Sequence, residues 1–253
     1  MSAVETYMLN PVRALGRFSL LMTQAFGSLH EFNVYRKNFF DQMVKIGIES
    51  IPIVALAAAF SGAVTTVQTA YQLTSPLYPK SIIGAIVAPS MILELGAVVT
   101  GFILTGRVGA RIAAELGTMR VTEQIDALEA MGLNSIGYLI IPRVLAGVFM
   151  FPVLYMVAVS VGIGGGIFVA DAGGWLAAGE FIDGAREFFN PFDPVFGVIK
   201  SLVFGFVITS ISCYKGYYTA GGAEGVGRST TQAAVTSCVY ILLADLLLAV
   251  TLL

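Results

Sequence analysis

Long apolar runs separated by short polar stretches dominate the chain and predict five membrane-spanning helices. An α-helix needs roughly 20 apolar residues to cross a bilayer, and each run is long enough. Charged side chains fall almost entirely between the runs, which is typical of a multi-pass membrane protein. The expected spans are residues 51–73, 81–106, 144–170, 194–214 and 229–253.

The first 45 residues show a different pattern, with apolar side chains at every third or fourth position and Arg13 and Arg17 on another side. These apolar positions are Val12, Leu15, Phe18, Met22, Phe26 and Leu29. The pattern predicts an amphipathic helix in the cytoplasmic membrane interface. A cleaved signal peptide and a short extra membrane segment are the alternatives. We therefore divide the chain into an interfacial helix region, 1–45, and one five-span domain, 46–253.

The distribution of Lys and Arg predicts the orientation. Of the 14 such residues, all but Lys80, Arg186 and Lys200 lie before the first span, between the second and third, or between the fourth and fifth. The side richer in Lys and Arg is normally cytoplasmic. We therefore expect a cytoplasmic N-terminus and an external C-terminus.

Composition narrows the function classes. Only 12% of the residues are charged, against about 25% in a soluble domain. The net charge of -2 and the absence of a basic patch give no reason to expect a nucleic-acid partner. Cys213 and Cys238 fall inside spans, where we expect packing thiols. The single histidine, His30, has no metal-ligand cluster near it, and the sequence contains no P-loop.

Glu94 is the only charged residue of the second span, with 13 residues before it and 12 after. That position is near the membrane midplane, where a charge costs about 2.5–3.5 kcal/mol on insertion scales. Such a residue is a candidate functional group, and the alternative is a neutral or hydrogen-bonded carboxyl that helps packing. We expect Lys200 to extend to the membrane surface, and Asp245 to be solvated or paired at the interface.

The loop between the second and third spans predicts a short helix at residues 123–131. Thr122 is suited to begin it and Gly132 to end it. One stripe carries Ile125, Leu128 and Met131, and another carries Glu123, Asp126 and Glu129. So short a helix is not stable alone in water, which favours a docking element for a partner. Alternatively, the apolar stripe rests on the membrane or on the protein's own spans.

The stretch LELGAVVTGFILTGRVGARIAAELGTMRVTEQIDALEAMG resembles the signature region of MlaE/YrbE-type permeases. These are the membrane subunits of ABC transporters that work with Mce-domain proteins. The pair Glu123 and Gln124, followed by IDALEAMG, is similar to the family's coupling helix. The resemblance covers nearly the whole chain.

The resemblance implies a homodimeric, non-catalytic permease in the bacterial inner membrane, with a periplasmic C-terminus. It implies a cytoplasmic ATPase subunit that carries ATP and magnesium, and a periplasmic, hexameric Mce-domain protein. The implied cargo is phospholipid or another two-tailed lipid. The residues implied in ATPase coupling are Glu123, Gln124, Ile125, Asp126, Leu128, Glu129, Met131 and Gly132.

A lipid cavity at the dimer interface is implied along the first span and the start of the ELG segment. The implied lining residues are Thr65, Gln68, Tyr71, Gln72, Leu73 and Glu94. Thr65, Gln68 and Gln72 share a helix face, although polar side chains in spans often only join helices. Leu93 stands where relatives often have Arg, so we expect Glu94 to lack a local cation.

Three other functions remain open. The first is a proton-coupled secondary carrier that uses Glu94 as its proton site, although no internal repeat is visible. The second is an intramembrane enzyme, which the absence of a nucleophile–base pair disfavours. The third is a scaffold that only anchors an ATPase.

Overall fold

The computed structural model describes residues 3–28, 32–73 and 79–253, with side chains from residues 13–28, 35–73 and 79–253. All regular elements in these ranges are helices. Five helical segments have the length and composition to cross a membrane, namely Tyr35–Gln72, Ile82–Val121, Ser135–Ala172, Phe192–Tyr217 and Gly222–Leu252. The predicted all-α integral membrane protein with five spans is therefore confirmed.

The elements follow one another with short connections. The first part of the chain contains α1 (Ala3–Gly27), α2 (Phe32–Ile46), the 3₁₀ turn η2 (Ile48–Ser50) and α3 (Ile51–Gln72). The second membrane segment consists of α4 (Ile82–Ser90), η3 (Met91–Leu95), α5 (Gly96–Leu104), η4 (Thr105–Gly109) and α6 (Ala110–Val121). The remaining helices are α7 (Gln124–Ala130), α8 (Ser135–Leu139), α9 (Ile141–Ala172), α10 (Ala178–Glu187), α11 (Phe192–Tyr217) and α12 (Gly222–Leu252).

Several helices extend beyond the predicted spans. The second segment continues to Val121 instead of ending near residue 106, and the fifth begins at Gly222 instead of 229. The first segment begins at Tyr35, because α2 and η2 lead directly into α3. Hydropathy marks only the part of a helix that lies in hydrocarbon. Outside the hydrocarbon, a helix continues through polar turns. The turn of α6 with the ion pair between Arg111 and Glu115 is an example.

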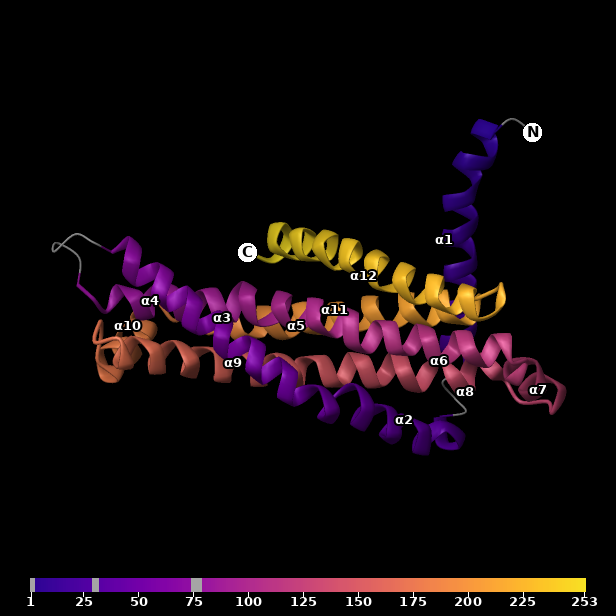
Figure 1. The fold of residues 1–253 in the computed structure, drawn as a ribbon, viewed down its shortest axis with the longest axis horizontal. Coiled ribbons are helices and arrows are strands. Elements are labelled where there is room, and N and C mark those ends of the chain that lie inside the picture. Colours follow the sequence, from indigo (N-terminus) through magenta and orange to yellow (C-terminus); the bar gives the residue numbers. More distant parts are fainter. Residues whose placement is uncertain (1–2, 29–31, 74–78) are drawn as a thin grey trace.

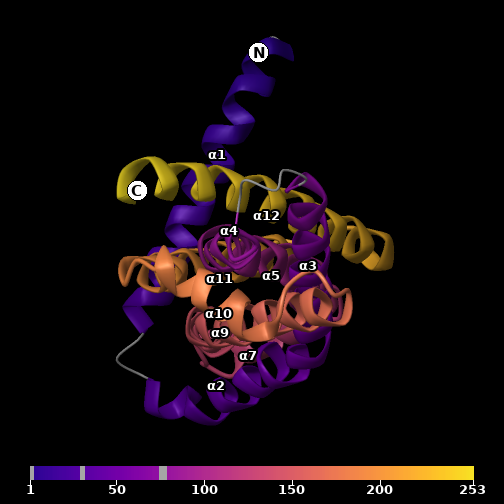
Figure 2. The ribbon, with the colours of Figure 1, turned by 90° about the vertical axis from the view of Figure 1, so that its left-hand side faces the viewer.

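Helix α1 runs across the long axis of the bundle in both views (Figures 1 and 2). Leu21, Met22 and Ala25 are buried, whereas Leu15 and Phe26 are exposed. A helix that runs across the membrane-spanning helices is compatible with a position along the membrane surface, which stays a prediction. His30 and Leu29, which entered the sequence predictions, lie outside the described residues.

Helices α9 and α11 form the centre of the bundle, and α3 packs along α9 at very short range. A Cβ atom on Gly62 would lie 1.9 Å from the carbonyl oxygen of Gly162. Similarly, a Cβ atom on Gly165 would lie 2.5 Å from the carbonyl oxygen of Ala59. The glycines of the third span therefore allow close helix crossing, as their G-x-x-x-G spacing suggests.

Candidate transport site and coupling surface

Glu94 lies in η3, a single turn of π-helix that interrupts the second membrane segment. Pro89 precedes this turn within α4. The hydroxyl of Tyr155, on α9, donates a 2.7 Å hydrogen bond to the carbonyl oxygen of Ile92 inside the π-turn. Such π-turns are frequent at functional sites because one extra residue changes the direction of the side chains.

Three charged side chains from three spans meet at this turn, and we call them the charge cluster: Glu94, Lys200 and Asp245. Lys200 Nζ lies 2.5 Å from Glu94 Oε2 and also forms an ion pair with Asp245 Oδ1. It further donates a hydrogen bond of 3.1 Å to the carbonyl oxygen of Leu93. The cluster joins η3, α11 and α12 within the bundle.

The charge cluster corrects two expectations and decides between the alternatives of a third. Lys200 does not extend to the membrane surface, because it is completely buried, with Nζ 5.3 Å from the centre of the Phe196 ring. Glu94 does have a cation nearby, supplied by another span in place of a neighbour in sequence. Asp245 is paired, which is one of the two alternatives predicted, but its partner is the buried Lys200 and only 15% of its side chain is exposed.

The exposed fractions distinguish the members of the cluster. Lys200 is enclosed, whereas 52% of the Glu94 side chain is exposed. Removing one partner of a buried ion pair costs roughly 3–5 kcal/mol. Lys200 therefore holds the cluster together, and Glu94 is the member with the largest surface for contact with another molecule.

The predicted polar group on the first span lies mainly on the surface. Tyr71 is 81% exposed, and Gln68 and Gln72 are exposed as well. Thr65 is partly buried and its hydroxyl donates to the carbonyl oxygen of Ser61. Leu73 packs against a small apolar cluster that includes Ile83, Val87 and Phe181. Helix α3 also packs against α4 and η3, but the contacts of Glu94 come from α11 and α12.

The predicted short helix after the second span exists as α7, with different N-terminal geometry. Glu123, not Thr122, occupies the N-cap position, with φ of 59°. The Thr122 hydroxyl instead donates back to the carbonyl oxygen of Thr118. The predicted capping role of Thr122 is therefore wrong. Gly132 has φ of 77° and follows the last turn, which confirms that it ends the helix.

Helix α7 is anchored to its own protein by side chains that the sequence suggested for docking. Ile125 is fully buried, and Leu128 packs partly against the core. Glu129 Oε1 accepts hydrogen bonds from Ser135 Oγ at 2.6 Å and from the Tyr217 hydroxyl at 3.1 Å.

Asp126 forms a 2.8 Å ion pair with Arg120, which also lies over the Tyr217 ring. The predicted coupling residues that remain on the surface of α7 and its two ends are Glu123, Gln124, Asp126, Glu129, Met131 and Gly132, with Met131 67% exposed. The residues of the apolar stripe therefore have different roles. Ile125 and Leu128 pack against the protein's own core, whereas Met131 is exposed and can contact a partner.

A second polar network, which the sequence predictions did not include, ties η2, η4, α6 and α9 together. Arg111 contacts Glu49 Oε2 at 2.8 Å and Glu115 Oε1 at 2.9 Å. Glu115 Oε2 in turn lies 3.2 Å from Arg143 Nη2. Arg107 donates to the backbone carbonyl of Glu49. This network links η2, in the first membrane segment, to the later part of the second segment and to the start of α9.

The fold and these sites define a multi-pass helical membrane protein with charges buried between its spans, as transport proteins have. Residues 39–251 match the family model described as "Permease MlaE". The chain belongs to the MlaE permease family, which confirms the resemblance seen in the sequence.

Individual relatives extend this result. The chain is 39% identical over 236 residues to a "Probable ABC transporter permease protein" of Rickettsia bellii, covering 93% of this chain and 91% of the relative. It is 32% identical over 251 residues to the "Intermembrane phospholipid transport system permease protein MlaE" of Haemophilus influenzae, covering 98% and 95%. It is 38% identical over 215 residues to "Protein TRIGALACTOSYLDIACYLGLYCEROL 1, chloroplastic" of Arabidopsis thaliana, covering 85% and 61%.

Proposed function

We propose that this permease is the membrane subunit of an ABC transporter that moves phospholipid between the bacterial inner membrane and a periplasmic Mce-type carrier. A separate cytoplasmic ATPase supplies the energy. The observation that carries the proposal is the position of Glu94, a half-exposed carboxylate fixed by a buried lysine within a membrane span.

The exposed side of Glu94 supports a homodimer. A charge that faces hydrocarbon is costly, so intramembrane carboxylates normally face protein or a water-filled cavity. Helices α3 and α12 also expose large apolar side chains along much of their length. A second copy related by a two-fold axis covers the same patch on both protomers. We therefore propose that the dimer interface, called the seam below, lies on the surface formed by α3, α12 and Glu94. Glu94 contributes a charged side chain to this interface.

A two-tailed lipid fits such a seam. Placing about 30 methylenes in water costs roughly 24 kcal/mol, so a lipid path needs continuous apolar walls. Phe60, Val64 and Val67 expose apolar surface on α3, and Tyr71 and Gln72 add polar atoms at its end. We assign Thr65, Gln68 and Leu73 to the same wall. The name of the Haemophilus influenzae relative, with its phospholipid transport system, agrees with this cargo.

The surface of α7 is the proposed contact with the ATPase. Gln124 and Met131 project from a helix that Ile125, Leu128 and Glu129 fix to the membrane domain. A rigid, exposed tip transmits movement better than a free loop, because little ordering is needed on binding. ATP and magnesium bind the partner subunit, and this chain contributes no catalytic residue.

The proposed topology places α7 in the cytoplasm and α10 in the periplasm. Because Lys200 is buried, only Lys80 and Arg186 remain as exposed cations on the outer side, which strengthens the asymmetry of Lys and Arg. The N-terminus is then cytoplasmic and the C-terminus periplasmic. A hexameric Mce-domain protein would receive or deliver lipid on the outer side.

Purification from native membranes in mild detergent tests the proposal. We expect a P-loop ATPase and phospholipid to be isolated together with the chain. In proteoliposomes, transfer of lipid to the periplasmic carrier should require ATP hydrolysis. Transfer that continues without nucleotide and follows a proton gradient would instead support the proton-coupled carrier that uses Glu94.

A further inference from the structure

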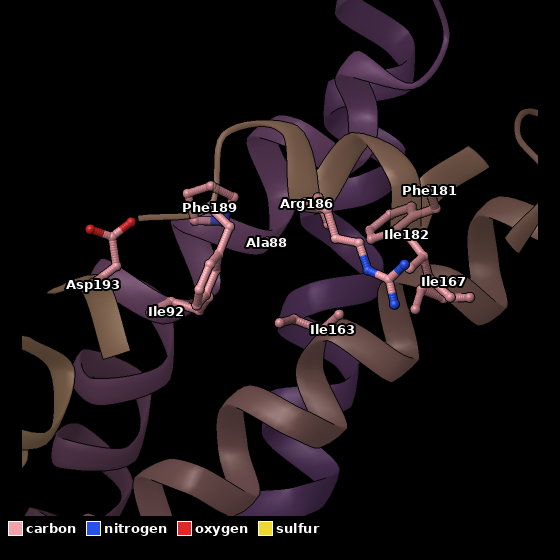
Figure 3. A pocket seen from close by; sticks show the side chains of 11 residues that line it. Ala88, Ile92, Ile163, Ile167, Phe181, Ile182, Arg186, Phe189 and Asp193 are labelled. Carbon is pink, nitrogen blue, oxygen red and sulfur yellow. The ribbon is translucent and has the colours of Figure 1, made fainter. Parts of the chain in front are cut away.

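A second candidate site lies on the outer part of the bundle, away from the proposed seam. An apolar pocket of about 240 Å³ opens between α4, η3, α9, α10 and the start of α11. We call it the outer slot (Figure 3). Its apolar walls include Ala88, Ile92, Ile163, Ile167, Phe181 and Ile182.

The walls of the outer slot are held by close helix packing. A Cβ atom on Gly84 would lie 2.1 Å from the carbonyl oxygen of Phe181, and one on Gly184 would lie 1.9 Å from that of Ser81. Helix α10 therefore lies backbone to backbone against α4. Pockets that bind ligands are usually preformed in this way.

Arg186 adds a positive charge to this apolar pocket. It occupies the last turn of α10, and Figure 3 shows its guanidinium group close to Ile163 and Ile167. Within the described residues, no carboxylate forms an ion pair with Arg186. Asp193 lies at the opposite end of the slot and is almost buried at the start of α11 (Figure 3). The slot is therefore apolar in its middle, positive at one end and negative at the other.

Exposed aromatic residues lie two to six positions after Arg186. Phe188, Phe189 and Phe192 all expose a large part of their side chains, and Phe189 borders the slot. Aromatic residues are enriched where the hydrocarbon meets the headgroups. This places the mouth of the slot at the height where a lipid phosphate meets its acyl chains.

We propose that the outer slot binds an anionic phospholipid of the outer leaflet, with one acyl chain along Ile163 and Ile167 and its phosphate on Arg186. A guanidinium group matches phosphate with two parallel hydrogen bonds. Asp193 repels a phosphate from the other end and so fixes the direction of the lipid. An apolar helix of a partner protein would fill the slot but leave Arg186 without a counter-ion, so the charges favour a lipid.

The site is distinct from the proposed seam but connected to it through the backbone. Ile92 belongs to the same π-turn as Glu94, and Asp193 begins the helix that carries Lys200. A lipid in the outer slot would therefore pack against the two elements that position the charge cluster. Its presence does not depend on the direction or cargo of transport.

Photocrosslinking in intact membranes tests the occupant. Ile182 borders the slot and is partly exposed, so it is replaced with benzoylphenylalanine in the full chain. We expect adducts that carry the mass of a phospholipid, and fewer of them in the R186Q variant. Adducts with a polypeptide, or lipid adducts unchanged by R186Q, would overturn the proposal.

Fluorescence quenching measures the headgroup preference in the purified protein. The single tryptophan, Trp175, is changed to Phe and Phe189 to Trp, so that the probe borders the slot. Brominated phosphatidylglycerol should quench this probe at lower concentration than brominated phosphatidylcholine. The R186Q variant should lose about fivefold of the preference, and R186K should keep most of it.

Lys80→Gln is the matched control, because it removes the other exposed outer cation while leaving the slot unchanged. A separate variant, Leu246→Trp, places the probe on the exposed face of α12, where quenching measures contact with the surrounding lipid. Equal quenching by both lipids at Phe189→Trp, or an equal loss of preference in K80Q, would contradict the proposal.

Discussion

Lys200 Nζ lies 2.5 Å from Glu94 Oε2, although the two residues belong to different spans and are 106 positions apart. The lysine is completely enclosed, while half of the glutamate side chain is exposed on the surface of the chain. An enclosed ammonium needs its carboxylate partners, because the desolvation cost is not otherwise offset. Together with Asp245, the pair therefore ties three spans together and fixes Glu94, a half-exposed carboxylate of the second span.

Lys200→Met should strongly destabilise the protein. The change leaves Glu94 and Asp245 beside each other without their ammonium, and the expected loss is about 3–5 kcal/mol of unfolding free energy. Thermal unfolding in detergent measures it. The triple variant E94Q/K200M/D245N removes all three charges and should recover much of the stability. Equal melting of K200M and the unaltered protein would show that the cluster contributes nothing to stability.

Glu94→Lys should abolish lipid transport, whereas Glu94→Gln should retain part of it. Glutamine keeps a carbonyl oxygen that accepts a hydrogen bond from Lys200. A lysine places a second ammonium beside the first, with only Asp245 between them to offset the repulsion. ATP-dependent lipid transfer in proteoliposomes measures the effect, and unchanged binding of the ATPase serves as the folding control. Full transport by E94K would rule out a role for Glu94.

The sequence predicted the spans well because the cost of placing polar groups in hydrocarbon is set residue by residue. It failed for the charge cluster because ion pairing depends on how helices are rotated and how deep each charge lies. A signal was present: Lys200 and Asp245 lie 6 and 8 residues from the predicted outer ends of their spans, at residues 194 and 253. At about 1.5 Å per residue, these depths differ by only ~3 Å, which is close enough to pair.

Helix α7 shows a second limit of sequence patterns. Periodicity placed Ile125, Leu128 and Met131 on one stripe, but it does not tell a docking face from a face that packs on the protein's own core. The structure buries Ile125 and leaves Met131 exposed. The π-turn at Met91–Leu95 was also not predictable, since its hydrogen-bond pattern depends on tertiary contacts such as that of Tyr155 with Ile92.

Gly62→Ala should destabilise the bundle, and Gly164→Ala should not. An added Cβ at Gly62 meets the backbone of Gly162 at 1.9 Å, whereas nothing lies within 4 Å of a Cβ at Gly164. Overpacking at such a crossing costs about 1–3 kcal/mol, and an open helical site tolerates or favours alanine. Melting temperatures of the two variants measure the difference. Equal stability of both would mean that α3 and α9 do not cross as closely as described.

Met131→Asp should weaken binding of the ATPase without destabilising the permease. The side chain is exposed on the tip of α7 and makes no contribution to the buried core. A charge in the centre of a docking surface typically costs more than 1.4 kcal/mol, which is about tenfold in affinity. Ile125→Asp provides the contrast, because it places a carboxylate in the core and should lower the melting temperature as well. Binding to the purified ATPase, measured beside thermal unfolding, separates the two effects.

Met131→Leu is the matched control and should bind normally. If the Met131→Asp variant binds the ATPase as tightly as the unaltered chain does, the exposed tip of α7 is not the contact with the ATPase.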